Sequence, residues 1–250
     1  MKDCSYVVHF AAQVSVPESI QNPDETIDIN VNGTQILVNE SRKTSIQKFV
    51  LASSAAVYGN NNSLPHKEAE IGEALSPYAK SKLKNEEQIR GLNSIDCQTF
   101  ALRFFNVYGL NKSIKSRSSA VIPSFIEQML RRKNPVVFGD GKQSRDFVHV
   151  DDVCNAIFSC LEQDLRANMH FVMNVATGNS TSLVDLIGEL NDIMSSQDDG
   201  IMRSPEFVDA RGGDILHSKG CIERITKTLG WSPSIQLREG LTRMIQQVRD

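Results

Sequence analysis

The sequence predicts an α/β protein with a doubly wound parallel sheet, followed by a smaller mixed α/β domain. Over about the first 110 residues, short apolar runs alternate with segments long enough for helices, which is the pattern of strand-helix-strand units. The run at 48–51 is short and β-prone, as expected for a strand buried on both faces of a parallel sheet. After residue 110 the character changes, so we expect one domain over 1–110 and another over 111–250, with some segments of the second returning to the first sheet.

The expected elements of the first domain follow one another as strand, helix, strand, helix, strand. The second helix begins at Ser76 and Pro77, because serine is a favourable N-cap and proline suits the first helical position. We expect strands at 6–11, 48–51 and 99–103, and a first helix at 26–41 that has Ile29, Gly33, Ile36 and Leu37 on one face.

The second domain is expected to mix short strands, turns and helices. Segment 111–119 is polar and basic, which is typical of a loop; a solvated linker and a lid over substrate are equally compatible with it. We expect a turn at 139–141 and helices near 152–162, 183–194 and 238–248.

Composition excludes several classes of partner. The 250 residues carry a net charge of -3 and are 40% hydrophobic, so a nucleic-acid or anionic-membrane partner is not expected. No apolar run is long enough to span a bilayer. The five cysteines lack a Cys-x-x-Cys motif and the five histidines lack metal-ligand spacing. We therefore expect reduced thiols, a cytoplasmic location and no metal.

Three residues form a pattern that points to chemistry. Ser54 ends the apolar run and is expected at the carboxyl end of its strand, where open α/β sheets bind ligands. Tyr78 and Lys82 are four residues apart at the start of a helix and share a face. A nearby ammonium favours the phenolate, so we expect Lys82 to lower the pKa of Tyr78 and allow general acid-base catalysis. The Tyr78–Lys82 pair alone is equally compatible with an ordinary solvated helix.

The neighbouring segments decide between these readings. Segments 53–59 (SSAAVYG) and 76–82 (SPYAKSK) occur in order and closely resemble the extended short-chain dehydrogenase/reductases, within them the NAD-dependent epimerase/dehydratase family. The resemblance covers nearly the whole chain. It implies a Rossmann-like fold, NAD as cofactor, Tyr78 as catalytic base, Lys82 on the nicotinamide ribose and Ser54 on the substrate oxygen.

The resemblance also assigns residues to the cofactor. Segment 9–13 (HFAAQ) matches the strand and turn that pass the NAD diphosphate, where small alanines allow close approach. Asn30 matches an asparagine for which a structural bracing role is favoured, and Phe105 matches a residue lying against the nicotinamide. The implied cofactor-binding residues are Phe10, Ala11, Ala12, Gln13, Asn30, Ser53, Tyr78, Lys82 and Phe105.

A third group is implied to bind a nucleotide sugar. Arg145 and Arg211 match arginines that clamp the diphosphate, a role that suits the paired donors of a guanidinium. Asn106 matches a further diphosphate ligand. The implied substrate-binding residues are Ser54, Tyr78, Asn106, Ala120, Val121, Val136, Phe138, Arg145, Arg211 and Ser218.

The subclass follows from two alanines. Dehydratases and decarboxylases of the family usually carry an acid where this chain has Ala55 or Ala56, whereas C4 epimerisation needs no such acid. We therefore expect C4 epimerisation of a UDP-sugar through a 4-keto intermediate, with UDP-glucose/UDP-galactose and UDP-N-acetylglucosamine/UDP-N-acetylgalactosamine both open. Ser218 matches a gating position where a small side chain leaves room for an N-acetyl group, although a helix N-cap role is at least as compatible with a serine. A homodimer through two helices, one carrying Tyr78, is also implied.

One feature departs from the family. No glycine-rich dinucleotide turn occurs between the first strand and first helix, and the chain opens at what resembles the family's fourth strand. An N-terminally truncated sheet, lacking roughly 60 residues, would result from a misplaced start, from a half supplied elsewhere or from genuine loss. The alternative functions are a non-catalytic nucleotide-sugar-binding remnant and a dehydratase or reductase of the same family. We also expect association or poor solubility.

Overall fold

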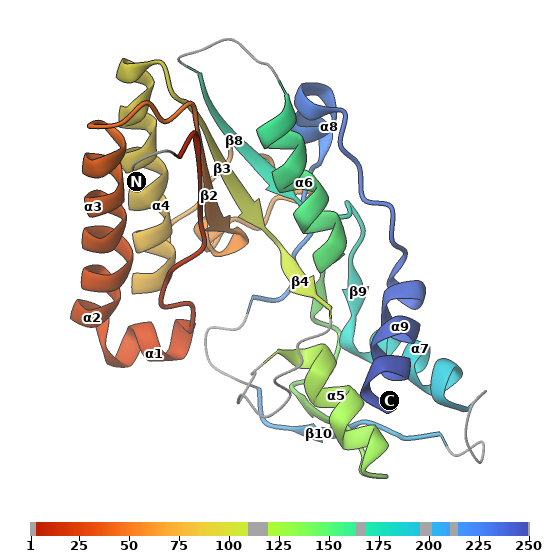
Figure 1. Ribbon diagram of the computed structural model, residues 1–250. Helices are drawn as coiled ribbons and strands as arrows, with labels where there is room; N and C mark the ends of the chain where they lie inside the picture. The colour runs from red at the N-terminus through yellow and green to blue at the C-terminus, as the bar shows by residue number, and fades with distance from the viewer. Residues whose placement is uncertain (1–3, 110–119, 164–168, 196–201, 211–214, 250) are drawn as a thin grey trace.

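The computed structural model describes residues 4–109, 120–163, 169–195, 202–210 and 215–249 (Figure 1). Its main sheet is wholly parallel in the order β1 (Tyr6–His9), β2 (Lys48–Ser54), β3 (Gln98–Phe104) and β8 (His170–Val175). The three strands expected from the first domain are confirmed, with ends that shift by up to three residues. The fourth, β8, comes from the second half of the chain.

Helices cover both faces of this sheet, as a doubly wound fold requires. Helices α3 (Gly33–Ser41) and α4 (Pro77–Arg90) lie on one face, and α6 (Val150–Glu162) lies on the other (Figure 1). The core under α3 and α4 contains Val38, Phe49 and Ile89, all fully buried. The core under α6 also receives Trp231 and helix α8 (Glu223–Leu229).

Helix α4 begins where the sequence predicts. The Ser76 hydroxyl accepts a hydrogen bond from the Ala79 N–H at 3.1 Å, and Pro77 occupies the first turn. This cap satisfies a backbone donor that has no partner inside the helix. The helix therefore starts just before Tyr78, which fixes where the tyrosine lies relative to β2.

The helical segment before β2 differs from the expectation in two ways. It is divided into α1 (Val16–Gln21), α2 (Pro23–Ile27), a π-helical turn (Asp28–Asn32) and α3. The side turned to the protein is largely polar, since Asn30, Thr34 and Val38 are buried while Ile29 and Ile36 are 43% and 63% exposed. Of the expected apolar face, Leu37 is partly buried and packs against the core, whereas Ile29 and Ile36 do not face it. Hydrogen bonds such as that between His9 Nε2 and Thr34 Oγ1 at 2.9 Å satisfy the buried polar groups.

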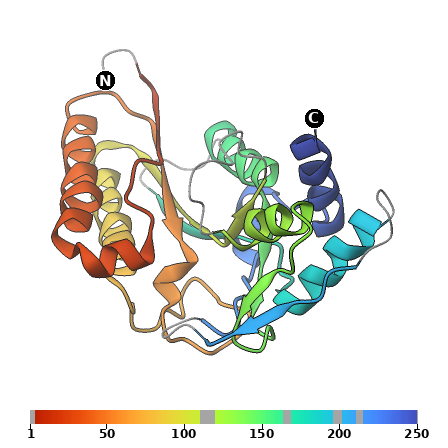
Figure 2. The same ribbon diagram turned by 90° about the horizontal axis from the view of Figure 1, so that it is seen from below.

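The second half of the chain builds three small strand pairs beside the main sheet. Strand β4 (Asn106–Tyr108) pairs with β7 (Phe147–His149), β5 (Val136–Phe138) with β10 (Glu206–Val208), and β6 (Ser144–Arg145) with β9 (Thr181–Ser182). Helices α5 (Val121–Leu130), α7 (Leu183–Ser195) and α9 (Leu237–Arg249) share one apolar core (Figure 2). The three helices expected near 152–162, 183–194 and 238–248 are confirmed.

Segment 111–119, the candidate linker or lid, lies outside the described residues. Among the helices of the described ranges, none combines the length and apolar character needed to cross a membrane.

Candidate active site

Three parallel strands bring the predicted residues to one edge of the main sheet. Strands β1, β2 and β3 end at His9, Ser54 and Phe104, and their carboxyl ends meet at the same edge because they run parallel. The segment 10–13 follows β1, and Phe105 follows β3. Sequence positions almost a hundred residues apart are thereby placed around one site.

The three catalytic candidates lie together at this edge. Ser54 ends β2, where its hydroxyl accepts a hydrogen bond from the Ala56 N–H at 3.2 Å, and its side chain acts to lower the pKa of Tyr78 at the start of α4. Lys82, one turn further, lies with its Nζ 5.7 Å from the centroid of the Tyr78 ring. The same ammonium donates a hydrogen bond to the carbonyl of Ala52 at 2.8 Å, which ties α4 to β2. Tyr78 and Lys82 are 9% and 4% exposed, so this pair does not belong to a solvated helix surface.

The electrostatics of the pair correct one expectation. The pKa of Tyr78 is raised rather than lowered, because burial disfavours the phenolate, and the Ser54 side chain only partly opposes that effect. Burial also lowers the pKa of Lys82 to about 8. At 5.7 Å from the ring centre, with one proton directed to a carbonyl, the ammonium does not overcome the desolvation of the phenol.

His9 adds a neutral group to the same edge. Its side chain is buried and contacts Thr34 through Nε2. Burial lowers its pKa, and the charge on Lys82 lowers it further. A neutral imidazole next to a buried ammonium avoids repulsion between two cations.

Asn30 has the contacts of a brace. Its Oδ1 accepts a hydrogen bond from the Gln13 N–H at 2.7 Å, and its Nδ2 donates to the Gln13 carbonyl and to Ser81 Oγ. Its own carbonyl accepts a bond from Asn85 Nδ2 at 2.8 Å. Asn30 thus joins the segment after β1 to helix α4, in agreement with the favoured structural role, and its assignment to the cofactor stays a prediction.

One buried side-chain atom in the segment after β1 is suited to bind a ligand such as NAD. Gln13 Oε1 is buried and, among the described residues, has no hydrogen-bond partner. A buried acceptor without a partner costs free energy, so a ligand that donates to it would be stabilised. The neighbouring Ala11 and Ala12 present small side chains, which permit close approach to the backbone.

The remaining cofactor candidates occupy different environments. Phe10 is 54% exposed and stacks on Phe104 with ring centroids 6.2 Å apart. Phe105 is buried beside Tyr58, at 6.1 Å between ring centroids. The Ser53 hydroxyl is directed away from solvent to Glu86, at 2.5 Å. Their roles toward NAD stay predictions.

The substrate candidates Asn106, Arg145 and Ser218 lie on adjacent backbone segments. Asn106 N–H donates to the carbonyl of Asp146 at 3.0 Å, and Ser218 N–H donates to that of Ser144 at 3.0 Å. The guanidinium of Arg145 donates from one terminal nitrogen to the carbonyls of Ser144 and Leu216. These contacts hold the arginine between β6 and the segment that carries Ser218. Arg211 lies outside the described residues.

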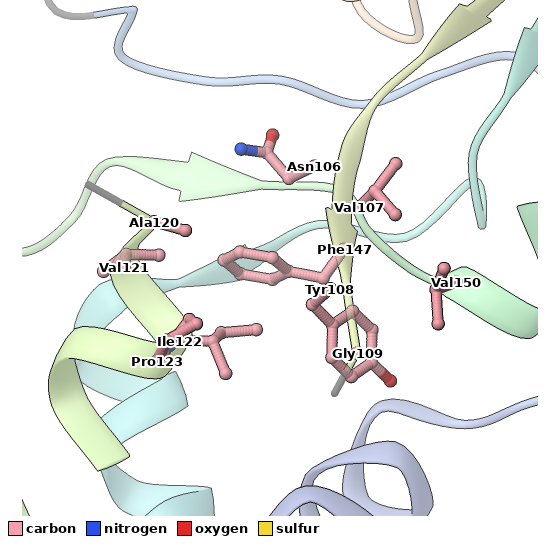
Figure 3. A pocket seen from close by; sticks show the side chains of 10 residues that line it. All are labelled: Asn106, Val107, Tyr108, Gly109, Ala120, Val121, Ile122, Pro123, Phe147 and Val150. Atoms are coloured by element: carbon pink, nitrogen blue, oxygen red, sulfur yellow. The ribbon is translucent and has the colours of Figure 1, made fainter. Parts of the chain in front are cut away.

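A cavity of about 400 Å³ opens between β4 and the start of α5. Its lining includes the predicted residues Asn106, Ala120 and Val121. Figure 3 shows the ring of Phe147 projecting into this space toward Val121, and Tyr108 beside it. Val136 and Phe138 are not part of this lining; they lie in β5, where the Phe138 carbonyl accepts a hydrogen bond from Gln143 Nε2.

The sequence predicts no role for Asp146, although this residue holds backbone segments near Arg145. Asp146, fully buried, accepts hydrogen bonds from the backbone N–H groups of Thr177, Gly178 and Gly220 and from the Thr177 hydroxyl. It follows Arg145 directly and so holds two segments, at 177–178 and at 220, near that arginine. Its partners lie 31 to 74 residues away in the chain, so nothing local in the sequence identifies the role.

Metal binding finds no support within the described part of the chain. No group of three or more histidine, cysteine, aspartate or glutamate side chains gathers there in an arrangement that could hold an ion. The described cysteines are free thiols.

Comparisons with known proteins agree with this geometry. Residues 1–176 match the model of the NAD dependent epimerase/dehydratase family. A putative UDP-glucose 4-epimerase of Methanocaldococcus jannaschii is 37% identical over 251 residues, which cover 100% of this chain and 78% of that protein.

Two solved structures show the same similarity. The UDP-N-acetylglucosamine 4-epimerase of Methanobrevibacter ruminantium, in complex with UDP-N-acetylmuramic acid, superposes with a TM-score of 0.90 at 33% identity, over 99% of this chain and 77% of that one. The UDP-glucuronic acid 4-epimerase of Bacillus cereus, in complex with UDP-glucuronic acid and NAD, gives a TM-score of 0.87 at 27% identity, over 99% and 77% of the two chains.

Proposed function

The chain belongs to the NAD-dependent epimerase/dehydratase family, and from that premise we propose that it interconverts the C4 epimers of a UDP-sugar through a 4-keto intermediate. The observation that carries the proposal is the group formed by half-buried Ser54 and buried Tyr78 and Lys82 at the carboxyl edge of the sheet. The alanines at 55 and 56 support epimerisation over dehydration or decarboxylation, because neither supplies a second acid.

Tyr78 moves the proton in this account. The phenolate form of Tyr78 takes the proton of the sugar 4-hydroxyl as C4 is oxidised, and the phenol so formed returns that proton when C4 is reduced from the opposite face. The Ser54 side chain acts to lower the pKa of Tyr78 and so lowers the cost of the phenolate. NAD, when bound, accepts the hydride from C4 and gives it back. Lys82, charged below its pKa of about 8, supplies a cation next to the phenol.

The UDP part of the substrate stays fixed while the sugar turns. Arg145 and Arg211 would clamp the diphosphate, with Asn106 beside them. Holding the nucleotide makes reduction of the intermediate effectively intramolecular, since the 4-keto sugar remains attached to a bound group. The hydrogen bond from the Asn106 N–H to the carbonyl of Asp146, the residue after Arg145, supports this arrangement.

The preferred sugar is proposed to be an N-acetylhexosamine. Ser218 is small and 7% exposed, and its backbone is bound to Ser144 next to Arg145. A side chain of this size leaves room for an N-acetyl group. UDP-glucose is expected to react as well, because a pocket that admits the larger sugar does not strongly reject the smaller one.

The chain is further proposed to form a homodimer through α3 and α4. Ile36 of α3 is 63% exposed, and Ile27 in the preceding α2 is 47% exposed. Exposed apolar side chains of this kind favour burial against a second copy.

The test is conversion of UDP-N-acetylglucosamine and UDP-glucose to their C4 epimers by the purified chain with added NAD, followed by NMR. We expect both products to form, with faster turnover of the N-acetylated sugar. Binding of either sugar without conversion would instead support a nucleotide-sugar-binding module. Release of water from the sugar would identify a dehydratase.

A further inference from the structure

Helix α4 contacts the end of β2 at three successive residues of the strand. Ser54 lies beside Tyr78, and the carbonyl that precedes Ser53 binds Lys82. Between them, the Ser53 hydroxyl donates to Glu86 Oε1 at 2.5 Å. Tyr78, Lys82 and Glu86 follow one another at intervals of four residues and therefore share one face of the helix. The bond between Ser53 and Glu86 is the one member of this set that no catalytic role explains.

The Glu86 carboxylate is buried and paired. Arg103 of β3 donates to both of its oxygens, from Nε at 3.0 Å and from a terminal nitrogen at 2.8 Å. Glu86 and Arg103 are 6% and 3% exposed. A buried ion pair of this kind contributes little net stability compared with an apolar pair, whereas its fixed two-point geometry restricts the positions of both partners. Positioning is therefore the better explanation for its presence.

Further polar residues lie beside the Glu86–Arg103 pair on the neighbouring strands of the sheet. Ser53, Arg103 and Asn174 are register partners on β2, β3 and β8. The Asn174 side chain donates to the carbonyls of His66 and Cys221, at 2.9 and 3.1 Å. The His66 N–H in turn donates to the carbonyl of residue 219, next to Ser218. Arg103 and the Asn174 N–H both donate to Glu68, to its carbonyl and to its Oε1, each at 3.0 Å, so these polar residues link α4 to the segment that carries Ser218.

We propose that Glu86 is a positioning residue which, through the Ser53 hydroxyl and held by Arg103, fixes the end of β2 against α4 so that Ser54 stays beside Tyr78. The inference rests on the proposed function only for its kinetic consequence. The Tyr78 hydroxyl titrates in the protein alone, so the effect of Glu86 on it is measurable without substrate or NAD.

The primary test is the ionisation of Tyr78 in Ser53→Ala. Tyrosinate absorbance is titrated in each protein and in its Tyr78→Phe counterpart, and the difference gives the ionisation of Tyr78. Displacement of Ser54 should raise the pKa of Tyr78 by about 0.5 to 1, the size of one net hydrogen bond. An unchanged Tyr78 titration in a folded Ser53→Ala protein would overturn the proposal.

Two variants control for lost stability and for lost hydroxyl. Ser41→Ala removes another fully buried serine hydroxyl, one that bonds only locally to Leu37 in α3; it should shift the melting temperature by a similar amount and leave the Tyr78 titration unchanged. Ser53→Thr retains a hydroxyl and should restore the wild-type titration. A shift in Ser41→Ala equal to that in Ser53→Ala would show a general loosening of the fold and contradict the proposal.

A double-mutant cycle tests Glu86 itself. Glu86→Asp keeps the charge that Arg103 requires but withdraws the carboxylate from Ser53. We expect it to raise the pKa of Tyr78 as Ser53→Ala does, and the double variant to show no further rise, because both changes remove one link. Additive rises would contradict a shared link. If turnover is present, kcat should fall about three- to tenfold with KM changed less than about twofold.

If the chain has no turnover, the titration still decides the positioning role. Failure of the proposed function and failure of this inference are therefore distinguishable.

Discussion

At the residue scale, the central feature is a lysine buried within the fold. Lys82 is 4% exposed and its pKa is lowered to about 8 by burial, against 10.5 for the free side chain. Between pH 8 and 10.5 the unfolded chain binds more protons at this residue than the folded protein does. The free energy of unfolding therefore rises with pH across this window, and the cost of the buried charge is fully present below pH 8.

Lys82→Met should remove this dependence. Below pH 8 the free energy of unfolding of the variant should exceed that of the wild type by up to about 3 kcal/mol. Loss of the hydrogen bond to Ala52 reduces this gain. The difference between the two proteins should shrink steadily up to pH 10.5. Urea unfolding of both proteins at several pH values measures it. A difference that stays constant with pH would show that Lys82 is not desolvated.

A second prediction at this scale concerns substrate size. Ser218→Tyr should fill the proposed space for the N-acetyl group and reduce kcat/KM for UDP-N-acetylglucosamine about tenfold or more, while UDP-glucose changes less than about threefold. Ser218→Ala is the matched control and should leave both sugars unchanged. Equal effects of Ser218→Tyr on both sugars would contradict a role of Ser218 in selecting the sugar.

At the scale of elements, helix α3 shows where sequence patterning fails. Ile36 is the more apolar residue but is 63% exposed, whereas Val38 is fully buried against the sheet. The packing face is set by Thr34 and Asn30, which are satisfied by His9 and Gln13. The pattern of apolar residues within the helix cannot identify these partners, because they lie elsewhere in the chain.

The two side chains should therefore differ in their effect on stability. Val38→Ala is expected to lower the free energy of unfolding by about 2 kcal/mol, because it leaves a void in the core. Ile36→Ala should change it by less than about 0.5 kcal/mol. Chemical denaturation of both variants checks the order. The reverse order would restore the face that the sequence predicts.

The strands and catalytic helix could be predicted because their signals are local. The apolar runs of β2 and β3, and the Ser76 cap of α4, each lie within a few residues of the element they define. The polar row through Glu86, Arg103 and Asn174 could not be predicted, because its members lie on separate elements of the chain. The raised pKa of Tyr78 was missed for the same reason, since burial is a property of the whole packing.

At the scale of the whole molecule, exposed isoleucines on α2 and α3 predict self-association. Ile27 and Ile36 should be covered in a dimer, so Ile36→Lys is expected to shift the sedimentation coefficient at micromolar concentration toward that of a monomer. Phe158→Lys is the control, since Phe158 is 60% exposed on α6 at the other face of the sheet. A monomeric wild-type chain, or equal effects of the two variants, would contradict an interface at α3.

We propose that C4 of the sugar is oxidised and reduced in place, with Tyr78 as the base. The most direct measurement follows deuterium from a UDP-sugar labelled at C4 in normal water with NAD. We expect the epimeric product to keep the deuterium at C4, and Tyr78→Phe to lower turnover by a factor of about 100 or more. Loss of the deuterium to solvent, or near wild-type turnover in Tyr78→Phe, would contradict it.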